Sequence, residues 1–246
     1  MQELVCYRRL RAAGVRPAAV LIELTPYMLA VADTADNRSL EQHWSCADLA
    51  VLGRYRDEPA ALYRSWWKAR AVPWFSYRYT LLNWLLPACV PAEARDGFKW
   101  ANVDESGWWL GHEVRDGPLP AAELRRRVEA TRAQYGAPLE DWRVTPAADR
   151  ALRELLGACR QDGTAAVVYL MPESSAMRSW YGPAARARLS AYLGRLVREE
   201  GVPVIDGRDW VPDAGFADGH HLGAAGARLC TERFGREVVG PLLRAR

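Results

Sequence analysis

The sequence predicts an α/β protein built around a parallel β-sheet. Two short apolar runs, residues 18–24 and 165–171, are typical of strands buried on both faces. A third run, residues 202–206, has the same character. Helical patterns alternate with these runs, and that alternation favours parallel pairing with helices on both faces of the sheet.

Capping residues locate the helices around these strands. Thr145 followed by Pro146 is an N-cap with proline in the first helical turn. Gly14 and Gly201 follow helical stretches as C-terminal stops. The helices expected in this part of the chain are 2–13, 146–161, 183–200 and 222–239.

A long insertion separates the first two strands. About 120 residues lie between them, more than an ordinary crossover needs. We therefore treat residues 1–246 as one domain that carries a largely helical, tryptophan-rich insertion at 31–144. Within it we expect helices at 45–56, 59–70, 73–86 and 119–135, and a loop at 88–118.

The tryptophans of the insertion allow two interpretations. Near-helical spacing favours burial between helices for four of them, Trp66, Trp67, Trp74 and Trp84. A glycine-containing loop instead carries Trp100, Trp108 and Trp109. Core packing is the expectation for the whole set, and a carbohydrate-stacking platform is the alternative.

Composition excludes several classes of protein. The net charge of +3 is small, and arginines are spread among acidic residues, so no nucleic-acid partner is expected. The five cysteines lie far apart with no CxxC pair, which favours reduced thiols. With no long uncharged apolar window and no signal peptide, we expect no membrane span and a cytoplasmic location by default.

The turn before the last helix carries the clearest chemical signal. Asp218 precedes His221 by three residues. A carboxylate at that spacing can accept the imidazole Nδ1–H and leave Nε2 to take a proton from a nucleophile. The plainer interpretation makes Asp218 an N-cap of the last helix and His221 a capping or core residue.

The same turn contains the residue types of a metal site, in Asp218, His220 and His221. No second cluster of ligands supports such a site, because His43 and His112 lie alone in the insertion. We therefore expect neither a metal nor an organic cofactor.

The order of elements, the Asp218-Gly-His220-His221 block before the last helix and the strands ending near Met171 and Asp206 resemble the SGNH (GDSL-type) hydrolase superfamily. The resemblance is to uncharacterised bacterial members with a long insertion. It implies a flavodoxin-like α/β/α fold and a Ser-His-Asp triad that acts on acyl esters, without cofactors. Carried over, His221 is the general base and Asp218 its orienting carboxylate.

Two motifs of that family have no counterpart here. No Gly-x-Ser turn lies near Met1, and the position of the family's Gly-x-Asn motif reads Thr25-Pro26-Tyr27. We therefore expect an N-terminally incomplete enzyme whose first strand and nucleophile are absent from this chain. Strand 18–24 would then present an open sheet edge, suited to self-association with a second chain.

Residues that follow the strands are expected to line the substrate site, since sites form at the carboxyl ends of parallel strands. They are Thr25, Glu173, Ser174 and His220. Ser174 and Ser175 are also the nucleophile candidates within the chain, although turn or helix capping is the commoner role of such serines.

Two functions follow from these observations. The first is an SGNH-type ester hydrolase or acyltransferase acting on a small-molecule or carbohydrate acyl ester. The alternative is a non-catalytic glycan- or partner-binding module on the same scaffold, suggested by the missing Gly-x-Asn motif and the tryptophan-rich insertion.

Overall fold

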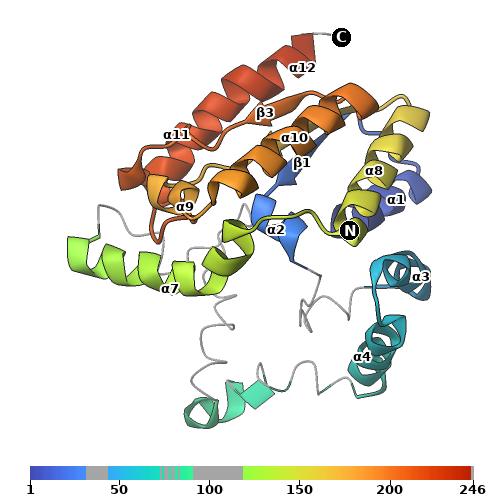
Figure 1. The fold of residues 1–246 in the computed structure, drawn as a ribbon. Helices are drawn as coiled ribbons and strands as arrows, with labels where there is room; N and C mark the ends of the chain where they lie inside the picture. Colours follow the sequence, from blue (N-terminus) through green and yellow to red (C-terminus); the bar gives the residue numbers. More distant parts are fainter. Residues whose placement is uncertain are drawn as a thin grey trace. The chain divides into compact units, whose positions relative to one another are not determined.

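The computed structural model describes residues 1–31, 44–72, 74, 78, 81, 82, 84–90 and 119–244. The chain divides into two compact units, one of residues 1–33 and 114–246 and the other of residues 34–113. The first unit contains the sheet, and the second is helical where it is described (Figure 1).

The sheet has three strands that are parallel, as predicted, and lie in the order β1-β2-β3. They are β1 (Ala19–Leu24), β2 (Ala165–Leu170) and β3 (Val204–Asp206). Leu24 and Asp206 both lie opposite Leu170 in the register, so the carboxyl ends of the strands meet at one edge. The fold is therefore mixed α/β, with most of its residues in helices.

Strand β1 pairs on one side only within the described part of the chain. Ile22 and Leu24 are buried, whereas Leu21 and Glu23 are exposed. Within the described residues, the outer edge of β1 thus has no neighbouring strand, and Leu21 is partly exposed there.

Three helices predicted from capping residues are confirmed: α1 (Gln2–Ala12), α8 (Pro146–Gln161) and α10 (Pro183–Glu200). The Thr145 hydroxyl accepts a hydrogen bond from the Ala148 amide at 3.3 Å, so Thr145 caps α8. Gly201 ends α10 with a φ of 65°, a left-handed conformation that favours glycine. Helices α8 and α10 pack against β2 and β3.

The predicted C-terminal helix is divided into three segments: α11 (Ala224–Phe234), a π-helical turn (Gly235–Val239) and α12 (Gly240–Arg244). Glycines begin both later segments. Because glycine disfavours a regular α-helix, these two positions are where the geometry changes.

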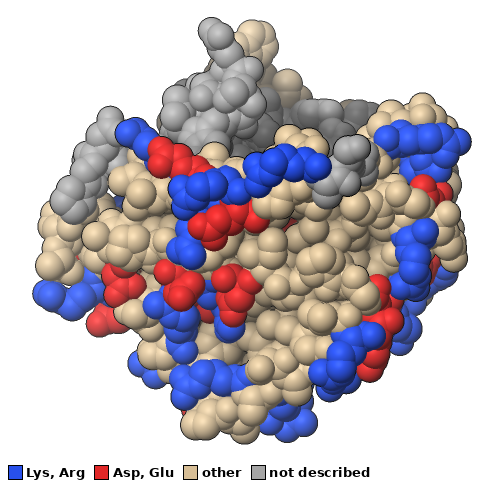
Figure 2. All heavy atoms as spheres, turned by 90° about the horizontal axis from the view of Figure 1, so that it is seen from above, with Lys and Arg blue, Asp and Glu red and all other residues tan. Residues whose placement is uncertain are grey.

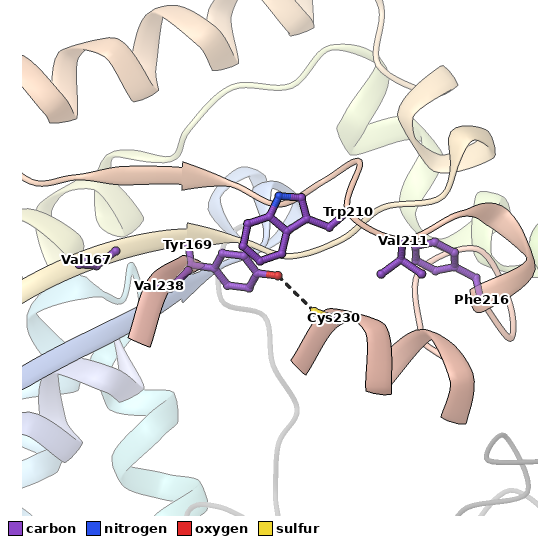
Figure 3. Close-up of a cluster of buried hydrophobic side chains, with 7 residues drawn as sticks. All are labelled: Val167, Tyr169, Trp210, Val211, Phe216, Cys230 and Val238. Atoms are coloured by element: carbon purple, nitrogen blue, oxygen red, sulfur yellow. Dashed lines mark hydrogen bonds between the residues drawn. The ribbon is translucent and has the colours of Figure 1, made fainter. Parts of the chain in front are cut away.

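A hydrophobic cluster joins α11 to β2 (Figure 3). The Tyr169 ring lies 4.7 Å from Phe234 and 5.2 Å from Trp210, between ring centroids. Its hydroxyl lies 3.3 Å from the Cys230 sulfur. Burial of this ring fixes α11, and with it the turn that precedes α11, against the sheet.

Helix α7 (Ala121–Glu140) extends the predicted helix 119–135 by five residues, through Gly136 and Pro138. It belongs to the first unit, although its sequence lies within the expected insertion. It packs on the two short helices that follow β1 and β2, namely α2 (Pro26–Ala30) and α9 (Ser175–Ser179) (Figure 1).

The second unit contains α3 (Cys46–Leu52) and α4 (Pro59–Ala71). Trp66 is buried and its indole N–H donates to the Trp44 carbonyl at 2.8 Å. The expectation of core packing is wrong for three other tryptophans, which are 63% to 80% exposed: Trp67, Trp74 and Trp84. For Trp67 the reason is its place on α4, one residue past the buried stripe of Leu62 and Trp66.

Several sequence predictions concern residues outside the described ones. These are half of helix 73–86, most of loop 88–118, and Trp100, Trp108, Trp109, His43 and His112.

All five cysteines are free. Basic and acidic side chains are interspersed on the face drawn in Figure 2. Within the described residues, no helix combines the length and apolar character needed to cross a bilayer.

One close glycine contact joins α11 to the segment that precedes it. A Cβ atom on Gly226 would lie 2.1 Å from the Gly215 carbonyl oxygen, well inside van der Waals contact. Gly235 also lies in the C-terminal helical region, but a Cβ atom there would meet no atom within 4 Å.

We predict that Gly226→Ala lowers the free energy of unfolding by about 1–3 kcal/mol, because the added methyl group must displace backbone. Gly235→Ala, the matched control, should leave stability unchanged or raise it by up to about 1 kcal/mol. Urea denaturation followed by circular dichroism measures both. Equal effects of the two substitutions would contradict the assigned contact.

Candidate functional site

The two ends of the turn between the sheet and α11 pair with each other through the backbone. Phe216 and Leu222 form an antiparallel bridge, and the Ala217 amide donates to the His221 carbonyl at 2.8 Å. Gly219, at the tip, has a φ of 100°, which an L-residue with a side chain rarely adopts. The backbone thus holds the residues between these bridges in one conformation.

Asp218 is the acceptor at the centre of this turn. Its Oδ2 lies 2.7 Å from His221 Nδ1, and its Oδ1 accepts the amides of His220 at 3.1 Å and His221 at 2.8 Å. Burial raises the pKa of Asp218, but the nearby ring nitrogens of His220 and His221 and the His221 amide outweigh it and hold the pKa far below its usual range. The ionised, carboxylate form of Asp218 is therefore favoured.

The N-cap alternative for Asp218 is wrong, because α11 begins at Ala224 with Gly223 as its N-cap. Asp218 instead caps its own turn through backbone amides and orients His221 through the ring nitrogen. A single carboxylate performs both tasks with separate oxygens.

The two histidines differ in exposure. The His221 side chain is 53% exposed, whereas that of His220 is 19% exposed. Their ring centroids lie 3.7 Å apart. His220 Nδ1 lies 3.2 Å from Asp218 Oδ1, is buried and has no hydrogen-bond partner.

Two tyrosines that sequence reasoning missed lie beside this turn. The Tyr135 ring of α7 lies 4.8 Å from the His220 ring, and Tyr27, which follows β1, lies 4.4 Å from Tyr135. Burial, together with Tyr27 and Asp218, raises the pKa of Tyr135. No sequence motif identifies Tyr135, because its contact with His220 depends on where α7 packs.

The serines after β2 are engaged in local structure. The Ser174 amide donates to the Gly219 carbonyl at 3.2 Å, and its hydroxyl accepts from the Met177 amide at 3.1 Å, so it caps α9. The exposed Ser175 hydroxyl donates to the Asp213 carboxylate. Ser174 therefore attaches the turn to the end of β2, and both hydroxyls have a structural partner.

Glu173 lies in the interior. It is 2% exposed, its Oε1 accepts from the Tyr181 hydroxyl at 2.5 Å, and its Oε2 is buried without a hydrogen-bond partner. Burial raises its pKa to about 7, although Tyr181 and the guanidinium groups of Arg208 and Arg178 lower it.

The remaining expected site residue, Thr25, is half-buried at the start of α2 and its side chain makes no capping hydrogen bond. A pocket of about 360 Å³ lies between α7 and the start of α10, with Tyr181 in its wall. Neither Asp218 nor His221 lines that pocket.

The structure thus brings together Asp218, His220, His221 and Ser174, with Tyr135 and Tyr27 packed behind them. Chemically, an ionised carboxylate paired with an exposed imidazole can accept and return a proton. Comparison of the chain with protein-family models, with curated proteins and with solved structures finds no match.

We predict that the stability of the protein falls as pH rises from 4.5, the ordinary pKa of glutamate, to about 7, the pKa of buried Glu173. Over this range the unfolded chain releases a proton that the folded protein retains, so the loss reaches roughly 3 kcal/mol. Urea denaturation at pH 5 and pH 8 measures it. Glu173→Gln should remove this difference and the exposed control Glu232→Gln should keep it; an unchanged pH dependence in Glu173→Gln would refute the assignment.

Proposed function

We propose that this chain provides the base half of a serine-type ester hydrolase or acyltransferase of the SGNH kind, on a flavodoxin-like three-layer fold. The observation that carries the proposal is the 2.7 Å contact between His221 Nδ1 and Asp218 Oδ2, in a turn attached to the carboxyl end of a parallel strand. Parallel α/β sheets place their sites at this edge. The strand order and the turn before the last helix support the same family.

In this mechanism a serine hydroxyl attacks the acyl carbonyl while His221 Nε2 accepts its proton. His221 then donates that proton to the leaving alcohol, and an acyl-serine ester remains. Water or an acceptor alcohol attacks the ester, again losing its proton to Nε2, and the serine is regenerated. Asp218 holds the Nδ1–H tautomer throughout and stabilises the imidazolium that forms in each step.

The nucleophile is proposed to come from a strand that pairs with the open edge of β1. Among the described residues, the serines beside the turn are Ser174 and Ser175, and the hydroxyl of each already has a structural partner. Neither is therefore proposed as the nucleophile. Support for an added strand comes from β1 itself, whose Leu21 is 38% exposed. The substrate proposed is a small-molecule or carbohydrate acyl ester, and a second chain is the other source of such a strand.

A fluorophosphonate probe, which reacts with activated serines, tests the proposal on the full gene product isolated from its own cells. We expect labelling of a serine outside residues 1–246, and loss of at least about 100-fold in labelling rate in His221→Ala because a general base is removed. His112→Ala, which removes a histidine far from this turn in the sequence, is the control. Absence of labelling, or equal labelling of wild type and His221→Ala, would overturn the proposal.

A second prediction concerns the tautomer and needs no activity. Asp218 accepts the Nδ1 proton of His221, whereas the amide of Asp218→Asn would present a donor there. We therefore expect His221 to carry its proton on Nδ1 in the wild type and on Nε2 in Asp218→Asn, with loss of most catalysis in the full gene product. Long-range ¹H–¹⁵N NMR of residues 1–246 distinguishes the tautomers, and an Nε2–H wild type would contradict the assigned dyad.

The alternative function, a glycan- or partner-binding module, is favoured by one observation. Trp67, Trp74 and Trp84 of the second unit are 63%, 66% and 80% exposed, and exposed indoles stack on sugar rings. Saturable quenching of tryptophan fluorescence by a glycan, in a gene product that the probe fails to label, would favour this module over the hydrolase.

A further inference from the structure

We propose that Asp218, His220 and His221 bind one divalent transition-metal ion, with Zn²⁺ the best-matched, and that the bound ion prevents His221 from acting as a base. The second half of this inference rests on the proposed function; the metal site itself does not. It revises the expectation from sequence, which found no second cluster of ligands around this turn.

The donors are close enough to share one ion. One ligand atom from each of the three residues lies within 4.8 Å of the other two. Both rings present Nδ1 to the same carboxylate, at 2.7 Å from Oδ2 for His221 and 3.2 Å from Oδ1 for His220. Donors bound about 2.0–2.2 Å from one tetrahedral ion lie farther apart than 2.7 Å, so the His221 ring must move back from Oδ2 when the ion binds.

An unsatisfied atom points to the same conclusion. His220 Nδ1 is buried and has no hydrogen-bond partner, although nearly every buried polar atom in a protein has one. The His220 ring is packed against two others: its centroid lies 4.8 Å from that of Tyr135 and 3.7 Å from that of His221. His220 Nδ1 is thus held near the Asp218 carboxylate without a hydrogen bond. A metal ion bound to this nitrogen would supply the missing partner.

The donor set selects the class of metal. Two imidazole nitrogens and one carboxylate oxygen suit Zn²⁺ and its neighbours, whereas Mg²⁺ and Ca²⁺ prefer oxygen donors only. The backbone amides of His220 and His221 both bind Asp218 Oδ1, so Oδ2 is the oxygen available to the ion while Oδ1 keeps the carboxylate oriented. The 53% exposure of the His221 side chain gives a path for entry.

The tautomer links the ion to the chemistry. A metal on Nδ1 of neutral His221 requires the ring proton to sit on Nε2. Nε2 is then a donor and cannot accept a proton from a serine. Metal binding moves this proton within the ring and leaves the carboxylate ionised, so no other group has to change charge.

Calorimetric titration of residues 1–246 with ZnCl₂ at pH 7.5 tests the site directly. We expect one equivalent to bind, and affinity at least about tenfold weaker in His220→Gln and in His221→Gln, which each remove one of three ligands. His112→Ala is the control and should bind as the wild type does. Unchanged affinity in His220→Gln, or no binding by the folded wild type, would overturn the metal site.

The probe reaction separates this inference from the proposed function. With both correct, Zn²⁺ slows labelling of the gene product and a chelator restores it. Zinc bound through His220 in a protein that the probe never labels would refute the hydrolase and keep the metal site. Labelling that depends on His221 but is unaffected by saturating Zn²⁺ would refute inhibition by the ion.

Discussion

Three N–H groups converge on the carboxylate of Asp218, and the geometry of the candidate site depends on that convergence. Two are backbone amides, of His220 and His221, and the third is the Nδ1 group of His221. Because the amides share one oxygen, the other is left to the ring. A residue without a carboxylate cannot satisfy all three donors, and the imidazole would lose its fixed orientation. The structural and the chemical roles of Asp218 are therefore inseparable.

The rest of the first unit holds this turn in place from three directions. Ser174 binds it to the end of β2, the Gly215–Gly226 contact sets it against α11, and Tyr135 packs on His220 from α7. The cluster around Tyr169 in turn anchors α11 on the sheet. Local hydrogen bonds determine the conformation of the turn, whereas long-range packing determines its position at the edge of the sheet.

The sequence was sufficient for the elements that local rules govern. Thr145 and Gly201 located helix ends, apolar runs located the strands, and the Asp218–His221 spacing was enough to predict the pair. Contacts between distant segments were not accessible in the same way. The approach of Tyr135 to His220 and the burial of Glu173 against Tyr181 arise from packing, which no spacing in one sequence encodes. The exposure of Trp67 has a local cause instead, because this residue lies one position past the buried stripe of α4.

The alternation of burial along β1 restricts what can add to the sheet. Ile22 and Leu24 face the interior, and Leu21 and Glu23 face outward. A parallel neighbour must keep this parity, since a slip of one residue would turn every apolar side chain to the wrong face. An added strand therefore needs small or polar side chains beside Glu23 and branched apolar ones beside Ile22. That parity is a selection rule by which a candidate segment can be accepted or rejected from its sequence alone.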